Sequence, residues 1–273
     1  VSLNAVANLG YAAGRFGVPV QAGDTVTTTS QVIGLKENSN KQTGVVYVRS
    51  TGTNQDGAMV VDYVRWVMVK KRDVDAPAPA ELVPELPASV AAADLVIPAG
   101  LNAQGYDDVL AGSIHRWDDY AVGEKIDHVD GMTIEEAEHM MATRLWQNTA
   151  KVHFNQHTEG QGRFGRRLIY GGHIISLARA LSFNGLGNAF KIAAINGGRH
   201  VNPTFAGDTI YAWSEVLEKI ELPGRADIGA LRLRLVALKN RSAADFTLKS
   251  EDGKGFDPAV VLDFDYTVLM PRR

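Results

Sequence analysis

The sequence contains no cysteine. This absence excludes disulfides and thiol catalysis, and it removes the commonest ligands of structural zinc. No stretch approaches the ~18 apolar residues that a membrane-spanning helix needs. The net charge of −3 gives no reason to expect nucleic acid or an anionic membrane as a partner. We therefore expect a globular protein that works in the cytoplasm.

Several common site motifs are also missing. The glycine pair of Asn196-Gly197-Gly198 lacks the Gly-Lys-Ser/Thr ending of a phosphate loop. The seven histidines show no metal-ligand spacing, and no Gly-x-Ser-x-Gly elbow occurs. We expect neither a metal nor an organic cofactor.

The first 73 residues are typical of β structure. Segments 25–32, 45–50 and 60–69 are rich in β-branched and aromatic residues, and Asp56-Gly57 suits a hairpin turn. The next segment is proline-rich, with Pro77, Pro79, Pro84, Pro87 and Pro98 among alanines. Proline removes backbone donors, so this segment predicts an extended linker lying along a surface. We divide the chain into a first unit (1–73), a linker (74–112) and a second unit (113–273).

The second unit mixes helices and strands. Thr133 and Glu136 have the spacing of a capping box, which predicts a helix from Thr133 to about Asn148. The nearly uncharged stretch 173–183 predicts a buried helix that begins near Gly172. Strands are expected at 190–195, 209–219, 230–239 and 260–270.

An internal repeat connects the two units. The stretch Arg15 to Thr25 aligns without a gap on Arg199 to Thr209, sharing arginine, proline and Ala-Gly-Asp-Thr at matching positions. The chain therefore holds two copies of one strand-rich unit. The first copy has no counterpart of the helix segment, so we expect the natural protein to carry roughly 70–85 further N-terminal residues. Arg15 and Arg199 recur in both copies and are expected to be structural.

The segment Asn148–Phe183 carries the candidate site. Asn148 and His153 lie shortly before the double glycine Gly171-Gly172, which precedes the buried helix. Glycine lets backbone N–H groups approach a ligand closely, and N–H groups at a helix start are unpaired and favour negative charge. We predict a catalytic segment with an oxyanion hole at the helix start.

The repeated Arg-x-x-x-Pro-x-x-Ala-Gly-Asp-Thr motif resembles the MaoC-like, enoyl-CoA hydratase 2 family of double-hotdog proteins. Their signature, Asp-x-Asn-Pro-x-His-x-Asp followed by His-Gly, corresponds here to Asn148 through Asn155 and then Tyr170-Gly171. His153 keeps its place. Asn148, Lys151, Asn155 and Tyr170 stand where the signature has Asp, Pro, Asp and His.

These departures resemble one subgroup in particular. The stretch TRLWQNTAKVHFNQHTEGQGRFGRRLIYGGHIISLARALSF is similar to the mesaconyl-CoA hydratases. The resemblance implies an α+β tandem hotdog fold, antiparallel sheets wrapping a central helix, with the N-terminal unit truncated in this chain. It implies a hydro-lyase that reversibly dehydrates β-methylmalyl-CoA to mesaconyl-CoA, with a CoA thioester as substrate and a homo-oligomer as the assembly.

The resemblance assigns acid/base catalysis to His153, whose imidazole titrates near neutrality. The oxyanion donors would be Gly171 and Gly172. Asn148 occupies the position of a second acid/base, but an amide cannot transfer protons at neutral pH. We expect Asn148 to orient the water or the thioester. A solvent-facing Asn148 and a plain tight turn at the glycines stay open as alternatives.

Substrate binding is expected from Arg163, Arg166 and Arg167, with Tyr170 and Asn155 beside them. One arginine would bind the substrate carboxylate or a CoA phosphate; alternatively, all three are solvated or paired with acids. The second-line acid/base candidates are His157, Glu159, Tyr170 and His173. Three other functions remain open: a 2-enoyl-CoA hydratase for another acyl chain, a hotdog thioesterase using Glu159, and a non-catalytic acyl-CoA-binding subunit.

Overall fold

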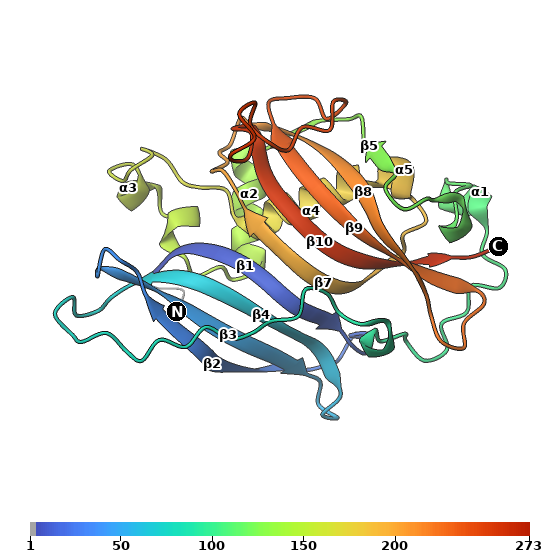
Figure 1. The fold of residues 1–273 in the computed structure, drawn as a ribbon, viewed down its shortest axis with the longest axis horizontal. Coiled ribbons are helices and arrows are strands. Elements are labelled where there is room, and N and C mark those ends of the chain that lie inside the picture. The colour runs from blue at the N-terminus through green and yellow to red at the C-terminus, as the bar shows by residue number, and fades with distance from the viewer. Residues whose placement is uncertain (1–3) are drawn as a thin grey trace.

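The computed structural model describes residues 4–273. In this part of the chain, ten strands form one sheet in which the paired strands run antiparallel, with the order β2-β3-β4-β1-β7-β10-β9-β8-β5 and β6 paired to β8 (Figure 1). The strands are β1 (Ala5–Phe16), β2 (Thr27–Glu37), β3 (Thr43–Thr53), β4 (Met59–Lys70), β5 (Lys125–Asp127), β6 (Met132–Thr133), β7 (Lys191–His200), β8 (Thr209–Glu221), β9 (Ile228–Lys239) and β10 (Val260–Pro271).

The helices are short and lie mostly in the second unit. They are α1 (Asp108–Ala111), α2 (Glu136–Leu145), α3 (Gln156–Glu159), α4 (Gly171–Leu181) and α5 (Phe183–Leu186), with 3₁₀ turns η2 (Ala92–Asp94), η3 (Trp117–Asp119) and η4 (Lys151–His153). No helix among residues 4–273 is long and apolar enough to cross a membrane.

The sheet confirms the internal repeat. The order β2-β3-β4-β1 is mirrored by β8-β9-β10-β7, and the two copies meet where β1 pairs with β7. Arg15 on β1 is paired with Asp62 on β4 at 3.0 Å, and Arg199 on β7 lies 3.9 Å from Asp263 on β10. Arg15 links β1 to β4, and Arg199 lies at the equivalent place beside β10, where Arg234 makes the closer contacts to Asp263.

The core of the second unit lies between α4 and its strands. The α4 helix lies against β8, β9 and β10 (Figure 1). Ile174, Leu177, Ala178 and Leu181 are buried at helical spacing and belong to the core cluster shared with these strands. This confirms the predicted buried helix. Within the described chain, β1–β4 carry no helix of their own. The expected additional N-terminal residues stay a prediction.

The capping-box prediction at Thr133 is wrong. Thr133 lies in β6, and its hydroxyl shares a 2.8 Å hydrogen bond with the Thr209 hydroxyl of β8. The α2 helix begins after Glu135, whose backbone N–H donates to the Glu138 carboxylate, and it ends at Leu145 rather than at Asn148. Glu138, three residues after Glu135, provides the capping carboxylate. The Thr133 hydroxyl is bonded to Thr209 in the β6–β8 pair and is not available as a cap.

The named strand segments are all confirmed, but the sequence pattern did not single out β1. That strand reads AVANLGYAAGRF, and alanine and glycine are poor strand formers. Its pairing on both sides, with β4 and β7, supplies the stability that its own residues do not.

The proline-rich segment lies along the sheet, as predicted. Leu82 forms a β-bridge with Leu35, and the Val90 N–H donates to the Asn196 Oδ1 at 2.9 Å. Val90, Leu95 and Ala103 are buried against β7–β10. The division at residues 74–112 stays a prediction.

Candidate active site

The start of α4 presents unpaired backbone donors. Tyr170 is the N-cap, and its carbonyl accepts from the N–H groups of His173 and Ile174 at 2.9 and 3.4 Å. The N–H groups of Gly171 and Gly172 have no acceptor in the described part of the chain. Donors at a first helical turn carry partial positive charge. They can therefore donate hydrogen bonds to a ligand oxygen.

Both glycines are needed for close packing. A Cβ atom on Gly171 would lie 2.4 Å from the Nε2 atom of His200, and one on Gly172 would lie 2.5 Å from the Tyr170 hydroxyl oxygen. Any larger residue would displace a neighbouring ring or the helix start.

His153 is held in one tautomer. Its Nδ1 atom is 3.0 Å from the Leu168 carbonyl oxygen. A carbonyl only accepts, so Nδ1 carries the hydrogen and Nε2 keeps a lone pair. Burial lowers the pKa of His153, against the opposing effects of the Leu168 bond and the Glu159 charge. The imidazole is thus neutral near pH 7 and has the form that a general base requires.

Aromatic contacts place His153 beside the helix start. Its ring centroid lies 5.8 Å from the ring of Tyr170, the residue that precedes Gly171. It also lies 6.5 Å from the ring of His139 on α2. The structure therefore brings together the predicted histidine and the predicted glycine pair through Tyr170.

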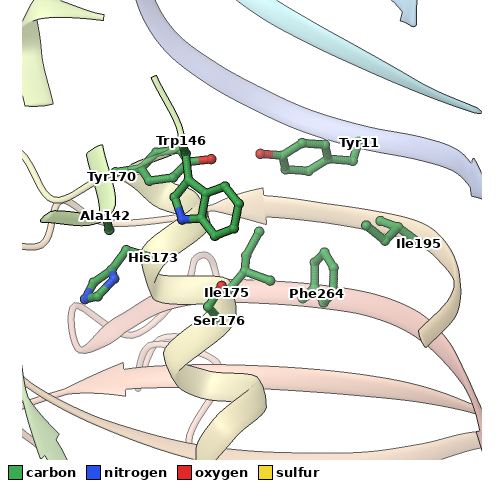
Figure 2. Close-up of a pocket in the computed structure, with 10 residues that line it drawn as sticks. Tyr11, Ala142, Trp146, Tyr170, His173, Ile175, Ser176, Ile195 and Phe264 are labelled. Carbon is green, nitrogen blue, oxygen red and sulfur yellow. The ribbon is translucent and has the colours of Figure 1, made fainter. Parts of the chain in front are cut away.

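A cavity of about 430 Å³ adjoins α4. It is lined by Tyr11, Ala142, Trp146, Tyr170, Gly172, His173, Ile175, Ser176, Ile195 and Phe264. These residues come from both copies of the repeat, and Figure 2 shows the hydroxyls of Tyr11 and Tyr170 turned toward one another. Apolar walls with a few polar groups suit an acyl chain. His153 is not itself a lining residue; it contacts the wall through Tyr170.

Comparison with known proteins establishes the family to which the chain belongs. The mesaconyl-CoA hydratase family matches residues 6–248. The chain belongs to this family. It is 66% identical to a β-methylmalyl-CoA dehydratase of Chloroflexus aurantiacus and 65% identical to a mesaconyl-CoA hydratase of Cereibacter sphaeroides. Each alignment covers 100% of this chain and 77% or 78% of the relative.

Solved structures confirm a MaoC-like hotdog fold. A MaoC domain protein dehydratase from Chloroflexus aurantiacus is 66% identical, with a TM-score of 0.96 over 100% of this chain and 78% of that one. A Mycobacterium tuberculosis protein with a double hotdog fold is 25% identical, with a TM-score of 0.66 over 98% of this chain and 76% of that one. That the first unit is truncated stays a prediction.

Asn148 lies outside the cavity lining. Its Oδ1 atom accepts from the Ala150 N–H at 2.9 Å, and its own N–H donates to the Thr143 carbonyl at 2.9 Å. These bonds turn the chain after α2 toward η4. They leave the side-chain NH₂ group as the part of Asn148 that could meet a ligand.

The three predicted arginines also lie outside the cavity lining. Arg163 and Arg166 are exposed, with guanidinium groups 5.1 Å from the Phe164 ring and 4.0 Å from the Phe205 ring. Arg167 is ion-paired with Glu136 of α2.

The remaining predicted polar residues have local roles. Asn155 caps α3 by accepting from the Thr158 N–H at 3.2 Å, and His157 is exposed on the same helix. The charge of Glu159 opposes, without reversing, the lowering of the His153 pKa by burial. His173 is 3.2 Å from the Glu138 carboxylate and lines the cavity.

Sequence reasoning missed His139, which is 1% exposed on α2. Its Nε2 atom accepts from the Tyr170 N–H at 2.9 Å. Burial, together with the neighbouring charges of His153 and His173, lowers the pKa of His139 to about 4, against the opposing charge of Glu138. It is therefore a neutral acceptor that anchors the residue before Gly171. Its spacing from buried Thr143, four residues later, was a signal that this helix face packs inward.

Replacing His139 by phenylalanine should leave the Tyr170 N–H without a partner and shift the start of α4. An unsatisfied buried donor costs about 1–3 kcal/mol. We expect kcat to fall about tenfold or more with little change in KM, because the oxyanion donors move. His139→Gln, whose amide oxygen can accept, should recover part of the loss. The exposed His157→Phe variant is the control. Unchanged kcat with a lower Tm would show that His139 serves stability alone.

Proposed function

We propose that this protein catalyses the reversible dehydration of β-methylmalyl-CoA to mesaconyl-CoA. The observation that carries the proposal is 66% identity, over the whole chain, to a β-methylmalyl-CoA dehydratase. The neutral His153 beside two free backbone donors is the arrangement that such a hydro-lyase needs.

In the hydration direction, the Nε2 atom of His153 takes a proton from water as the water oxygen bonds to the β-carbon. The double-bond electrons move to the thioester, whose oxygen gains negative charge. The N–H groups of Gly171 and Gly172 stabilise that charge. The imidazolium then returns the proton to the α-carbon, so that water is added across the double bond. Dehydration is the reverse sequence.

Arg163 and Arg166 are assigned to the phosphates of CoA. Both are exposed on the loop before α4, and Arg166 is held over the Phe205 ring. A guanidinium group matches phosphate geometry well. Arg167 orders this loop through Glu136, and Asn155 supports it by capping α3.

The homo-oligomeric assembly and the cytoplasmic location belong to the proposal as well.

Asn148 is assigned to orienting the water or the thioester through its NH₂ group. Asn148→Ala should lower kcat/KM about tenfold, because the oriented bond and the turn to Ala150 are both lost. Asn148→Asp keeps an acceptor for the Ala150 N–H, so it should fold normally and keep a single-limbed pH profile. If Asn148→Asp were more active and its profile gained a second limb, the reaction would use two titrating groups.

One assay separates the candidate functions. The protein is incubated with mesaconyl-CoA while the enoyl-thioester absorbance and free thiol are followed together. Loss of absorbance without thiol release is the expected result. Thiol release would indicate a thioesterase using Glu159, and no change in either signal would indicate an acyl-CoA-binding subunit. Faster turnover of crotonyl-CoA than of mesaconyl-CoA would indicate a hydratase for another acyl chain.

A further inference from the structure

Arg65 on β4 lies directly opposite Tyr11 on β1 in the strand register. Side chains at opposed positions of an antiparallel pair are on the same face, with Cβ atoms about 4.5–5.5 Å apart. Tyr11 lines the cavity beside α4. Arg65 is not itself a lining residue, but its side chain lies on the same face of the sheet as that of Tyr11.

Among the residues that the structure describes, the Arg65 guanidinium makes no hydrogen bond or ion pair. Its Nε atom is buried without a hydrogen bond, and no carboxylate among residues 4–273 is paired with it. Asp62 lies three positions earlier on β4, so its side chain is on the other face. There it is paired with Arg15 and Arg49 at 3.0 and 2.6 Å. Arg65 is half-buried, and a partly desolvated cation without a partner favours an anionic ligand.

Two phenols accompany this cation. The hydroxyls of Tyr11 and Tyr170 face each other across the cavity (Figure 2). Burial raises the pKa of each phenol, and the nearby Arg65 charge only partly offsets the rise. Both phenols are therefore O–H donors near neutral pH. Burial likewise lowers the pKa of His200 to about 4. Its buried Nε2 atom, which lies against Gly171, has no hydrogen-bond partner in residues 4–273.

We propose that Arg65, together with the hydroxyls of Tyr11 and Tyr170, binds the free carboxylate of the substrate's acyl group. This inference rests on the proposed function, because mesaconyl-CoA is an enoyl thioester that carries a second, free carboxylate. That carboxylate is attached to the β-carbon, the atom that water attacks.

The placement accounts for how the reacting carbon is fixed. Tyr170 immediately precedes Gly171, so the carboxylate site and the oxyanion donors are adjacent along the chain. The free carboxylate of the short acyl group would be bound by Arg65 while its thioester oxygen accepts hydrogen bonds from the backbone N–H groups. Arg65 also gives the first unit a part in recognition, since β4 belongs to that unit.

The test compares ligands that differ only in the carboxylate. Arg65→Gln should lower kcat/KM for mesaconyl-CoA about 10²-fold, as the loss of a charge-assisted contact implies. It should change kcat/KM for 2-methylcrotonyl-CoA, which has a methyl group in that place, by less than about threefold. Arg65→Lys keeps the charge without the planar fork and should lose an intermediate amount. Lys70→Gln, an exposed charge loss on the same strand, is the matched control.

A binding measurement keeps this test separate from the proposed function. Calorimetry compares succinyl-CoA with butyryl-CoA, neither of which can react. The wild type should bind succinyl-CoA more tightly, and Arg65→Gln should abolish that preference even if the wild type fails to hydrate mesaconyl-CoA. Equal losses for both ligands, or a preference that survives in Arg65→Gln, would overturn the carboxylate site.

Discussion

The His153→Ala variant is expected to lose about 10³- to 10⁴-fold in kcat/KM for mesaconyl-CoA, because it removes the only group assigned to carry a proton. His153→Gln should lose a similar amount, since an amide cannot titrate. Progress curves with the enoyl-thioester absorbance measure the loss. His157→Ala, an exposed histidine a few residues away, is the control and should retain full activity. Activity of His153→Ala within tenfold of wild type would remove His153 from the mechanism.

The same residue sets the pH dependence of hydration. Burial holds the pKa of His153 below its ordinary value, so the imidazole is a base throughout the neutral range. The kcat/KM for hydration should stay level as the pH falls toward 6.5 and decline only at lower pH, where the ring becomes protonated. In His153→Ala the residual rate should lack this decline. A wild-type profile that already falls between pH 8 and 7 would contradict the assignment.

Local sequence signals predicted the buried helix next to the candidate catalytic segment, because the residues that determine it are close together along the chain. His153, the glycine pair and α4 follow one another along the chain, and the apolar spacing of α4 determines which face is buried. The repeat likewise predicted two equivalent strand sets, since each set repeats one turn-and-strand pattern.

What the sequence could not predict depends on contacts between distant segments. Tyr11 lines the cavity, with Arg65 opposite it on β4, only because β1 pairs with both β4 and β7, and the composition of β1 does not predict a strand. His139 acquires its role from one hydrogen bond to Tyr170, which lies 31 residues further along the chain. The arginines predicted to bind the substrate carboxylate or a CoA phosphate were those nearest in sequence to His153, whereas the arginine that we propose for the carboxylate belongs to the other unit.

Gly171→Ala tests the oxyanion hole directly. The added methyl group would lie 2.4 Å from the His200 Nε2 atom, so either that ring or the start of α4 must move. We expect kcat/KM to fall about 10²- to 10³-fold, the range found when one oxyanion donor is lost. Stability should change little, because alanine is about 1 kcal/mol better than glycine within a helix and offsets part of the strain. Steady-state kinetics and thermal unfolding, measured together, separate the two effects.

Two further variants decide whether the loss comes from the displaced donors. Gly197→Ala is the matched control, since its nearest non-neighbouring atom would be 3.9 Å from the new Cβ, and it should remain active. His200→Ala combined with Gly171→Ala makes room for the methyl group and should recover at least tenfold of the lost kcat/KM relative to Gly171→Ala alone. The recovery follows because the helix start can return to its position while both backbone N–H groups are still present. A Gly171→Ala variant with wild-type kcat/KM would show that the thioester oxygen is bound elsewhere, and the free N–H groups at the start of α4 would then lack a catalytic role.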